Sequence, residues 1–145
     1  MLELEIEVIA RALIRKDDRV LFCKSIKGSY LYLPGGHVEF GETAAAAVAR
    51  ELVEETGQPS TVGSLALVHE HLFRQGPHLH HELNLVFHVE LERDEVESRE
   101  KKIAFEWLAT SDLAGRDVRP SMLYQWLKNP PRPGGAPHWL SEPLD

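Results

Sequence analysis

Residues 43–56 (TAAAAVARELVEET) form the longest stretch of the chain whose composition predicts a helix. Thr43 is the expected N-terminal cap, with Gly41 or Glu42 as alternative boundaries, and Gly57 is a typical helix stop. A helix of this kind buries its apolar side by packing on another element, and strand-like segments flank it on both sides. The fold is therefore expected to combine this helix with a sheet.

The flanking segments have the alternating or continuous apolar patterns of strands. Segments 2–14 and 20–25, joined by the turn 16–19, predict a hairpin, and further strands are expected at 30–33, 61–74, 80–93 and 103–109. A helical turn capped by Ser111 or Asp112 is expected at 111–115, and a second helix, opened by Pro120, at 121–128. This order predicts an α+β or a layered α/β/α domain with a mixed sheet, and residues 1–145 are expected to form a single domain.

Composition excludes some classes of partner. The formal net charge of -7 argues against non-specific binding to a nucleic acid polymer or an anionic membrane. No stretch approaches the roughly 18 apolar residues of a membrane span, and the first ten residues carry acids where a signal peptide carries basic residues. The single cysteine, Cys23, is expected in a buried strand and forms no intrachain disulfide, which fits a reducing compartment. Together these features predict a cytoplasmic protein.

The end of the predicted helix carries an unusual set of charges. Glu51, Glu54 and Glu55 fall on one face because they are three and four residues apart. Like charges at this spacing repel, and the negative end of the helix dipole adds a penalty of ~0.3–1 kcal/mol. A hard divalent cation such as Mg²⁺ or Mn²⁺ would relieve both effects. The small residues Ala44 and Ala47, earlier on this face, are expected to leave open space beside the carboxylates.

The loop before the helix supports the metal hypothesis. Gly35 and Gly36 allow the backbone to approach a ligand closely, so that a carbonyl oxygen there can join the carboxylates. From Gly36 to Gln58 the chain reads GHVEFGETAAAAVARELVEETGQ, which resembles the Nudix box. Eight positions fit its spacing: Gly36, Glu42, Arg50, Glu51, Leu52, Glu54, Glu55 and Gly57. Gln58 departs, since the box usually ends with an aliphatic residue at this packing position.

The resemblance implies the Nudix fold, an α+β fold in which a mixed sheet lies between helices (α/β/α). It also implies hydrolysis of a pyrophosphate bond in a nucleoside diphosphate linked to another group. It implies metal ligands at Glu51, Glu54 and Glu55, the carbonyl of Gly35, and Glu42 as a further or water-mediated ligand. Arg50 is then expected to orient the glutamates through charge-assisted hydrogen bonds. One to three Mg²⁺ or Mn²⁺ ions would be the cofactor, activating water and neutralising a nucleotide-type substrate.

The catalytic base is less tightly specified. Within the box Glu54 is the first choice, whereas Glu82 and then Glu70 are the best candidates outside it. Tyr30, Tyr32, Phe73 and Phe87 are candidates for stacking on a base, and Arg11 and Arg74 for meeting phosphates. The nearby histidines, His69, His71, His78, His80 and His81, match no familiar zinc spacing and lack paired cysteines, which favours ordinary strand or loop positions.

Two functions compete: a metal-dependent pyrophosphohydrolase, and a catalytically inactive Nudix-fold module that binds nucleotides or regulates. The complete set of box glutamates favours the enzyme. Substrate choice among nucleoside triphosphates, ADP-ribose-like sugars and dinucleoside polyphosphates stays open. The Pro/Gly-rich tail, 130–145, is expected to dock back through Trp139 and Leu140 or to meet a partner subunit, and a homodimer is the default expectation.

Overall fold

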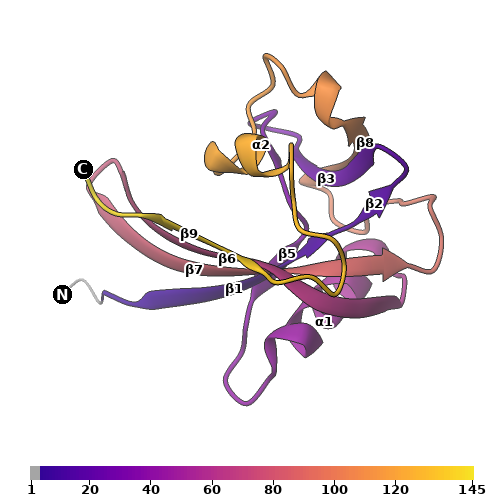
Figure 1. Ribbon diagram of the computed structural model, residues 1–145, viewed down its shortest axis with the longest axis horizontal. Coiled ribbons are helices and arrows are strands. Elements are labelled where there is room, and N and C mark those ends of the chain that lie inside the picture. The colour runs from indigo at the N-terminus through magenta and orange to yellow at the C-terminus, as the bar shows by residue number, and fades with distance from the viewer. Residues whose placement is uncertain (1–3) are drawn as a thin grey trace.

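The computed structural model describes residues 4–145, whose strands lie in two sheets (Figure 1). The larger sheet contains, in spatial order, β5 (Gly35–His37), β1 (Ile6–Leu13), β7 (His78–Leu91), β6 (Ser60–Gln75) and β9 (His138–Glu142). It is mixed, because β1 is parallel to β7 and β9 to β6, whereas β5–β1 and β6–β7 are antiparallel. In the smaller sheet β3 (Arg19–Ser25) pairs antiparallel with each of β2 (Arg15–Lys16), β4 (Leu31–Tyr32) and β8 (Ile103–Ala109).

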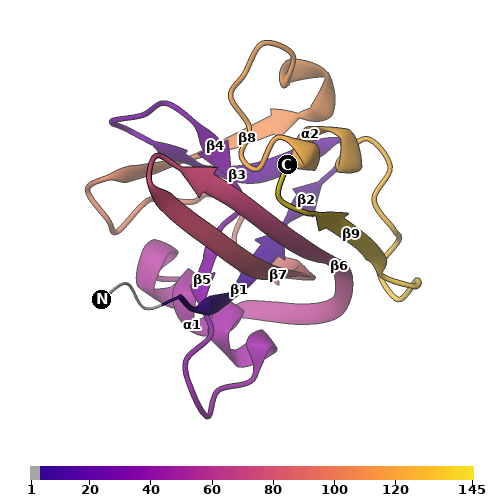
Figure 2. The ribbon, with the colours of Figure 1, turned by 90° about the vertical axis from the view of Figure 1, so that its left-hand side faces the viewer.

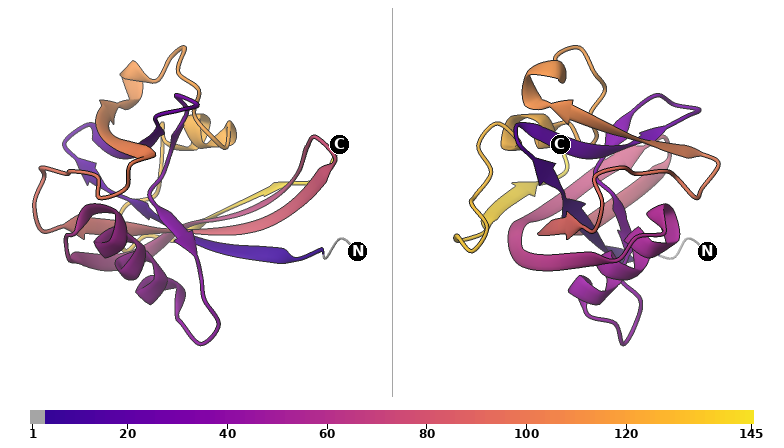
Figure 3. Two further views of the ribbon diagram at one scale, coloured as in Figure 1. Left: turned by 180° about the vertical axis from the view of Figure 1, so that it is seen from behind. Right: turned by 90° about the vertical axis from the view of Figure 1, so that its right-hand side faces the viewer.

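Helix α1 (Ala44–Thr56) covers one face of the larger sheet, while the smaller sheet and the short helix α2 (Met122–Trp126) lie over the other face (Figures 1 and 3). Strand alternation divides the core accordingly. In β1, Ala10 and Ala12 join the apolar cluster beneath α1, whereas Leu13 joins the cluster beneath α2, which includes Trp126. Arg11 alternates with the two alanines and therefore belongs to the face turned away from α1.

The predicted ends of α1 are confirmed. Thr43, rather than Gly41 or Glu42, is the cap, and its side-chain oxygen accepts a hydrogen bond from the Ala46 N–H at 3.1 Å. Gly57 adopts a left-handed conformation with φ of 73° and donates its N–H to the Val53 carbonyl. The expectation of open space beside the acidic face is wrong at Ala47, which is fully buried in the cluster between α1 and the sheet.

The hairpin expected from 2–14 and 20–25 forms only at its end. The two-residue strand β2 pairs with β3, but β1 leaves for the larger sheet and pairs with β5 and β7. By contrast, the two long strands expected at 61–74 and 80–93 form as β6 and β7, and they pair as a hairpin (Figure 2) with Gln75 opposite His78 around a tight turn at Gly76 and Pro77. Local pattern identifies strands, whereas partner choice depends on which apolar faces meet in three dimensions.

The helical segments near the C-terminus are shorter than expected. The turn predicted at 111–115 is a 3₁₀ turn, η1 (Thr110–Asp112), without a side-chain cap at either Ser111 or Asp112. The helix predicted at 121–128 is reduced to the five residues of α2, which follow Pro120. Both segments contribute apolar side chains to the core rather than long helical surfaces, through Leu113 before α2 and Leu123 within it.

The tail folds back on the sheet, as one of the two alternatives predicted. Strand β9 pairs with β6 and runs toward the tip of the β6–β7 hairpin (Figure 1). Leu140 packs on the apolar core, whereas Trp139 is 61% exposed, so that docking uses only one of the two expected anchors. Within residues 4–145, no helix has the length and apolar character needed to cross a membrane.

We expect Thr43→Ala to destabilise the protein by about 1 kcal/mol, because it removes the acceptor for an N–H at the start of α1. Ser121→Ala is the matched control, since Ser121 precedes α2 without making a side-chain cap and its loss should change stability by less than about 0.5 kcal/mol. Urea unfolding followed by circular dichroism measures both. Equal effects of the two substitutions would contradict a capping role for Thr43.

Candidate functional site

The loop and helix of the box meet through a close approach between Gly36 and Glu51. A Cβ atom at Gly36 would overlap the Glu51 carboxylate, so only glycine allows this carboxylate to lie against β5. Gly35 is restricted for another reason: its φ is 143°, and a side chain there would overlap the backbone of Ala10 in β1. The two glycines therefore let β5 lie between β1 and the acidic end of α1.

Arg50 joins the acidic groups of the loop and the helix. Its guanidinium donates to both carboxylate oxygens of Glu42 at 2.7 and 3.0 Å, to Glu51 at 3.0 Å and to Glu54 at 3.3 Å. It also donates to the backbone carbonyl of His37 at 3.1 Å. The guanidinium lowers the pKa of Glu42 mainly by hydrogen bonding, and the carboxylates raise the pKa of Arg50. Arg50 thus contacts three of the box glutamates, and its orienting role stays a prediction.

Glu55 lies in a different environment from the other box glutamates. It is only 6% exposed, and its Oε2 lies 3.7 Å from the Cys23 Sγ in β3. Burial, and after it repulsion from Glu51, raises the pKa of Glu55 to about 8. Burial, and after it the charge of Glu55, raises the pKa of the Cys23 thiol. Cys23 is buried in a strand, as expected. Glu55 therefore carries a proton near neutral pH when no cation is beside it.

The box carboxylates have the chemistry of a hard-cation site. They offer oxygen atoms, which Mg²⁺ and Mn²⁺ prefer, and the repulsion between Glu51 and Glu55 is of the kind that a divalent cation relieves. In the described residues Arg50 pairs with Glu51 and Glu54, while Glu55 turns toward Cys23, so their oxygens are not gathered into one tight group. A cation would have to draw these carboxylates together.

Charge compensation at the end of α1 extends beyond Arg50. The loop 92–102, which is rich in charged residues, crosses this end, and the Arg99 N–H donates to the Glu55 carbonyl at 2.8 Å. The Arg99 guanidinium lies against Gly57, the cap of the helix. Gln58, the departure from the box, is 1% exposed and binds the same loop, donating to the Glu95 carbonyl and accepting from the Arg93 N–H. Its polar side chain thus fastens a loop where an aliphatic one would only pack.

A cavity of about 560 Å³ opens on the face of the larger sheet turned away from α1. It is lined by Arg11, Tyr30, Tyr32, His71, Phe73, Arg74, Gln75, Glu82, Arg119, Pro120 and Ser121. The lining combines aromatic rings with three arginines, the groups that bind a flat base and anionic phosphates. Cavities of this size and composition accommodate small-molecule ligands.

Arg11 and Tyr32 connect the cavity to the box. Both line the cavity, and both lie close enough to Glu55 for its charge to affect their pKa values. Arg11 is held by hydrogen bonds to the Asn84 side chain and the Leu33 carbonyl, each at 3.0 Å. Arg11 and Tyr32 therefore lie between the cavity and Glu55 at the acidic end of α1.

The structure separates the other sequence candidates. Glu82 lines the cavity, and its charge opposes the lowering of the Arg11 pKa by burial. Glu70 is not among the cavity-lining residues and accepts a hydrogen bond from Ser141 of β9 at 2.9 Å. Tyr30, Tyr32, Phe73, Arg11 and Arg74 all reach the cavity, whereas Phe87 packs in the core beneath α1.

Sequence reasoning missed the role of some cavity-lining residues. Arg119 follows no motif, yet its guanidinium lies 4.2 Å from the centre of the Tyr30 ring in a cation–π contact. His71 belongs to a row of stacked rings, His69–His71–Phe73–His80, with centroid separations of 5.1, 4.4 and 4.7 Å. Burial lowers the pKa of His71, which favours the neutral imidazole. The spacing of two residues between His69, His71 and Phe73 in β6 could have indicated that these rings share one face of the sheet. No comparable pattern in the sequence indicated Arg119.

Comparisons with known proteins agree with this architecture. A family model described as the NUDIX domain matches residues 5–127. A NUDIX hydrolase from Nitrosomonas europaea superimposes with a TM-score of 0.72 at 20% identity, covering 96% of this chain and 79% of its own. A MutT NUDIX hydrolase from Burkholderia pseudomallei superimposes with a TM-score of 0.70 at 25% identity, covering 86% and 97%. These matches confirm the predicted α+β fold built on a mixed sheet.

A curated protein shares a shorter region. An ADP-ribose pyrophosphatase from Methanocaldococcus jannaschii is 45% identical over 62 residues, which is 40% of this chain and 36% of that protein. The alignment with this chain therefore spans about a third of that relative's length.

The raised pKa of Glu55 predicts that the metal-free protein becomes less stable as the pH rises. In the unfolded chain Glu55 loses its proton near its ordinary pKa of 4.5, whereas the folded protein keeps it until about pH 8. The folded state binds more protons in this window, so the free energy of unfolding should fall as pH rises from 4.5 to 8. Glu55→Gln removes this contribution and should gain about 1–3 kcal/mol relative to wild type between pH 5 and pH 8.

Chemical denaturation in EDTA at pH 5 and pH 8 measures the difference. Glu54→Gln is the matched control, because the neighbouring Glu54 side chain is 53% exposed, and it should follow the wild-type pH dependence. A Glu55→Gln curve parallel to that of wild type would show that Glu55 does not retain its proton.

Proposed function

The chain belongs to the NUDIX domain family, and on this premise we propose that it hydrolyses a pyrophosphate bond in a nucleoside diphosphate linked to another moiety. The observation that carries the proposal is the complete box beside an arginine-lined cavity: Glu51, Glu54 and Glu55 lie at one end of α1, and Arg50 binds Glu51 and Glu54. The matched family supports the predicted enzyme class, a Nudix-type pyrophosphohydrolase acting on acid anhydrides.

We assign Mg²⁺ or Mn²⁺ to the box carboxylates Glu51, Glu54 and Glu55, with the carbonyl of Gly35 as a backbone ligand. Glu42 is a further or water-mediated ligand in this assignment, and its bidentate pair with Arg50 favours the less direct role. When bound, such a cation neutralises phosphate oxygens and lowers the pKa of a bound water. Binding requires Glu55 to release its proton, which couples metal affinity to pH.

The residues of the chain divide the remaining work. Glu54 is the exposed box carboxylate and is our choice for the base that accepts the proton of the attacking water. Arg50 is a positioning residue that keeps Glu51 and Glu54 in place, while Arg11 presents positive charge between the cavity and Glu55. Because Glu82 lines the cavity, it is the alternative base, whereas Glu70 has a structural partner in Ser141.

We propose an ADP-ribose-like nucleoside diphosphate sugar as the first substrate to test. The curated relative named as an ADP-ribose pyrophosphatase supports this choice, although it shares only part of its length with this chain. The cavity offers Tyr30, Tyr32 and Phe73 for stacking on a base and Arg119 and Arg74 for anionic groups. Nucleoside triphosphates and dinucleoside polyphosphates complete the substrate panel.

The proposal predicts release of nucleoside monophosphate or phosphate in Mg²⁺ or Mn²⁺ and none in EDTA. Glu51→Gln and Glu55→Gln should each lower kcat by at least about 100-fold, since each removes a charge from the proposed cation site. Glu39→Gln is the control, because Glu39 lies in the loop before α1, is 70% exposed and makes only a long contact of 3.9 Å with Arg50. Product formation is measured by chromatography. If no substrate in the panel gave product with either cation, a catalytically inactive binding module would be favoured.

The same assay decides between the two bases. Glu54→Gln should lower kcat strongly and abolish the rise of rate with pH, whereas Glu82→Gln should change mainly KM. Glu90→Gln provides an exposed control on the same strand as Glu82. If Glu54→Gln kept full activity and Glu82→Gln lost it, Glu82 would be the catalytic base.

The cavity makes a separate prediction about binding. Phe73→Ala should raise KM for a nucleotide substrate by about 10–100-fold with little change in kcat, because base stacking contributes ~1–3 kcal/mol. Phe87→Leu is the matched control, since Phe87 packs beneath α1 and does not line the cavity. Steady-state kinetics with the substrate identified by the panel measures both. An unchanged KM in Phe73→Ala would place the base elsewhere.

A further inference from the structure

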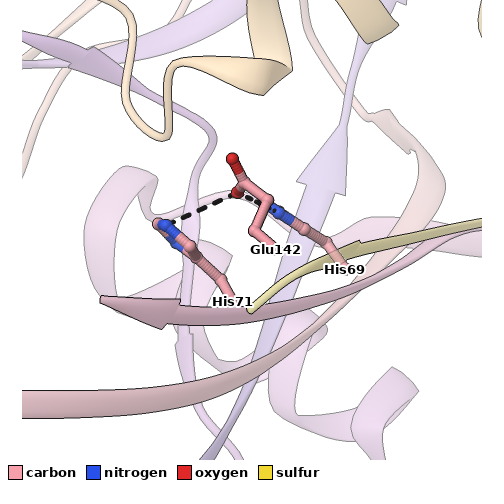
Figure 4. Close-up of side chains that lie close together, drawn as sticks. All are labelled: His69, His71 and Glu142. Atoms are coloured by element: carbon pink, nitrogen blue, oxygen red, sulfur yellow. Dashed lines mark hydrogen bonds and ion pairs between the residues drawn. The ribbon is translucent and has the colours of Figure 1, made fainter. Parts of the chain in front are cut away.

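Three potential metal ligands converge at the join between β6 and β9, apart from the box. His69 and His71 are two residues apart in β6 and therefore lie on the same face of the sheet. The register of the parallel pair β6–β9 places Glu142 opposite His71. One carboxylate oxygen of Glu142 lies 2.6 Å from the His69 Nε2 and 3.4 Å from the His71 Nε2 (Figure 4). The three ligand atoms lie within 4.8 Å of one another.

We propose that His69, His71 and Glu142 form a binding site for a borderline divalent transition metal, of which Zn²⁺ is the first to test. Two imidazole nitrogens and one carboxylate oxygen suit Zn²⁺ and not Mg²⁺, which prefers an all-oxygen environment. Three protein ligands leave a fourth, tetrahedral position for water. The box is a separate site with different chemistry, so this inference does not depend on the proposed hydrolase activity.

The two distances between histidine and Glu142 require little rearrangement for metal binding. Zn–N bonds of about 2.0–2.1 Å and Zn–O bonds of about 2.0–2.2 Å set neighbouring tetrahedral ligand atoms about 3.4 Å apart. The separation between His71 and Glu142 already has this value. The shorter one, between His69 and Glu142, needs to open by less than about 1 Å as the metal displaces the shared proton.

The surroundings have the features of a built site. The His69 side chain is 4% exposed, and those of His71 and Glu142 are 19% and 22% exposed, so the ligands are shielded but reachable. A second cavity of about 520 Å³, lined by His71, Glu142 and the last three residues, offers a path for the ion. Leu140 fixes β9 from the core side, and Ser141 binds Glu70, which together hold Glu142 in register.

The site would fasten the C-terminal strand to the wall of the main cavity. Strand β9 lies after residue 127, where the family match ends, and only Glu142 of the three ligands belongs to that segment. His71 also lines the main cavity and stacks on Phe73 at 4.4 Å. Metal binding would therefore couple the order of the tail to the position of an aromatic cavity wall.

The test is equilibrium dialysis of Zn²⁺ against metal-free full-length protein in excess Mg²⁺, which occupies oxygen-ligand sites without competing for imidazole. We expect one tightly bound Zn²⁺ per chain and a higher Tm. Glu142→Gln and His71→Phe should each weaken binding by more than about 100-fold, since loss of an outer partner alone costs 10–100-fold. His78→Ala, an exposed histidine at the hairpin tip, and Glu55→Gln, a box variant, should bind as wild type does.

Co²⁺ supplies a second readout that does not depend on the stability of one variant. Intense visible absorption of a tetrahedral Co²⁺ complex is expected for wild type, Glu55→Gln and His78→Ala, and its loss for Glu142→Gln, in which the amide can still hydrogen bond to His69. Absence of Zn²⁺ binding to wild type, or equal binding by wild type and Glu142→Gln, would overturn the proposal and leave His69 and Glu142 as a hydrogen-bonded pair. Neither outcome would bear on the box, whose test is turnover in Mg²⁺ or Mn²⁺.

Discussion

The acidic end of α1 depends on the hydrogen bonds that the guanidinium of Arg50 makes. It bonds to Glu42 and to the His37 carbonyl on the loop side, and to Glu51 and Glu54 on the helix side. Hydrogen bonds between ionised partners are about twice as strong as neutral ones, and two of these form a bidentate pair with Glu42. Without this cation the loop would lose its anchor, and the carboxylates would repel one another at the negative end of a helix.

Arg50 does not reach every acid equally, and this inequality separates the glutamates by chemistry. Glu54 is exposed, whereas Glu55 is buried beside Cys23 with a pKa of about 8. The two neighbouring carboxylates thus differ in environment, because one is hydrated and the other is not, and burial favours the protonated form of Glu55. In the proposed enzyme this suits Glu55 to a cation that replaces its proton, and Glu54 to exchange of protons with water.

Sequence reasoning succeeded where the determinants are local. The boundaries of α1, its caps at Thr43 and Gly57, and the grouping of Arg50 with the box acids follow from residues within one turn or loop. It failed where the determinants are distant. The open space expected at Ala47 is filled because the helix packs closely on the sheet, and β1 leaves the expected hairpin to pair with β7, about 70 residues later. Arg119 reaches the cavity through a loop without any motif.

The histidines of β6 illustrate the same limit in a functional setting. Their spacing, judged alone, matched no zinc motif, because the third potential ligand, Glu142, comes from the tail and is brought into place only by the β6–β9 register. The chain thereby keeps two kinds of ligand apart: oxygen atoms at the end of α1, and imidazoles on the opposite face of the sheet. Since Mg²⁺ favours the first and Zn²⁺ the second, this separation would let one small fold use a labile hard cation beside its substrate and a retained borderline cation in its framework. His71, which faces both the main cavity and Glu142, is the residue through which the two sites would communicate.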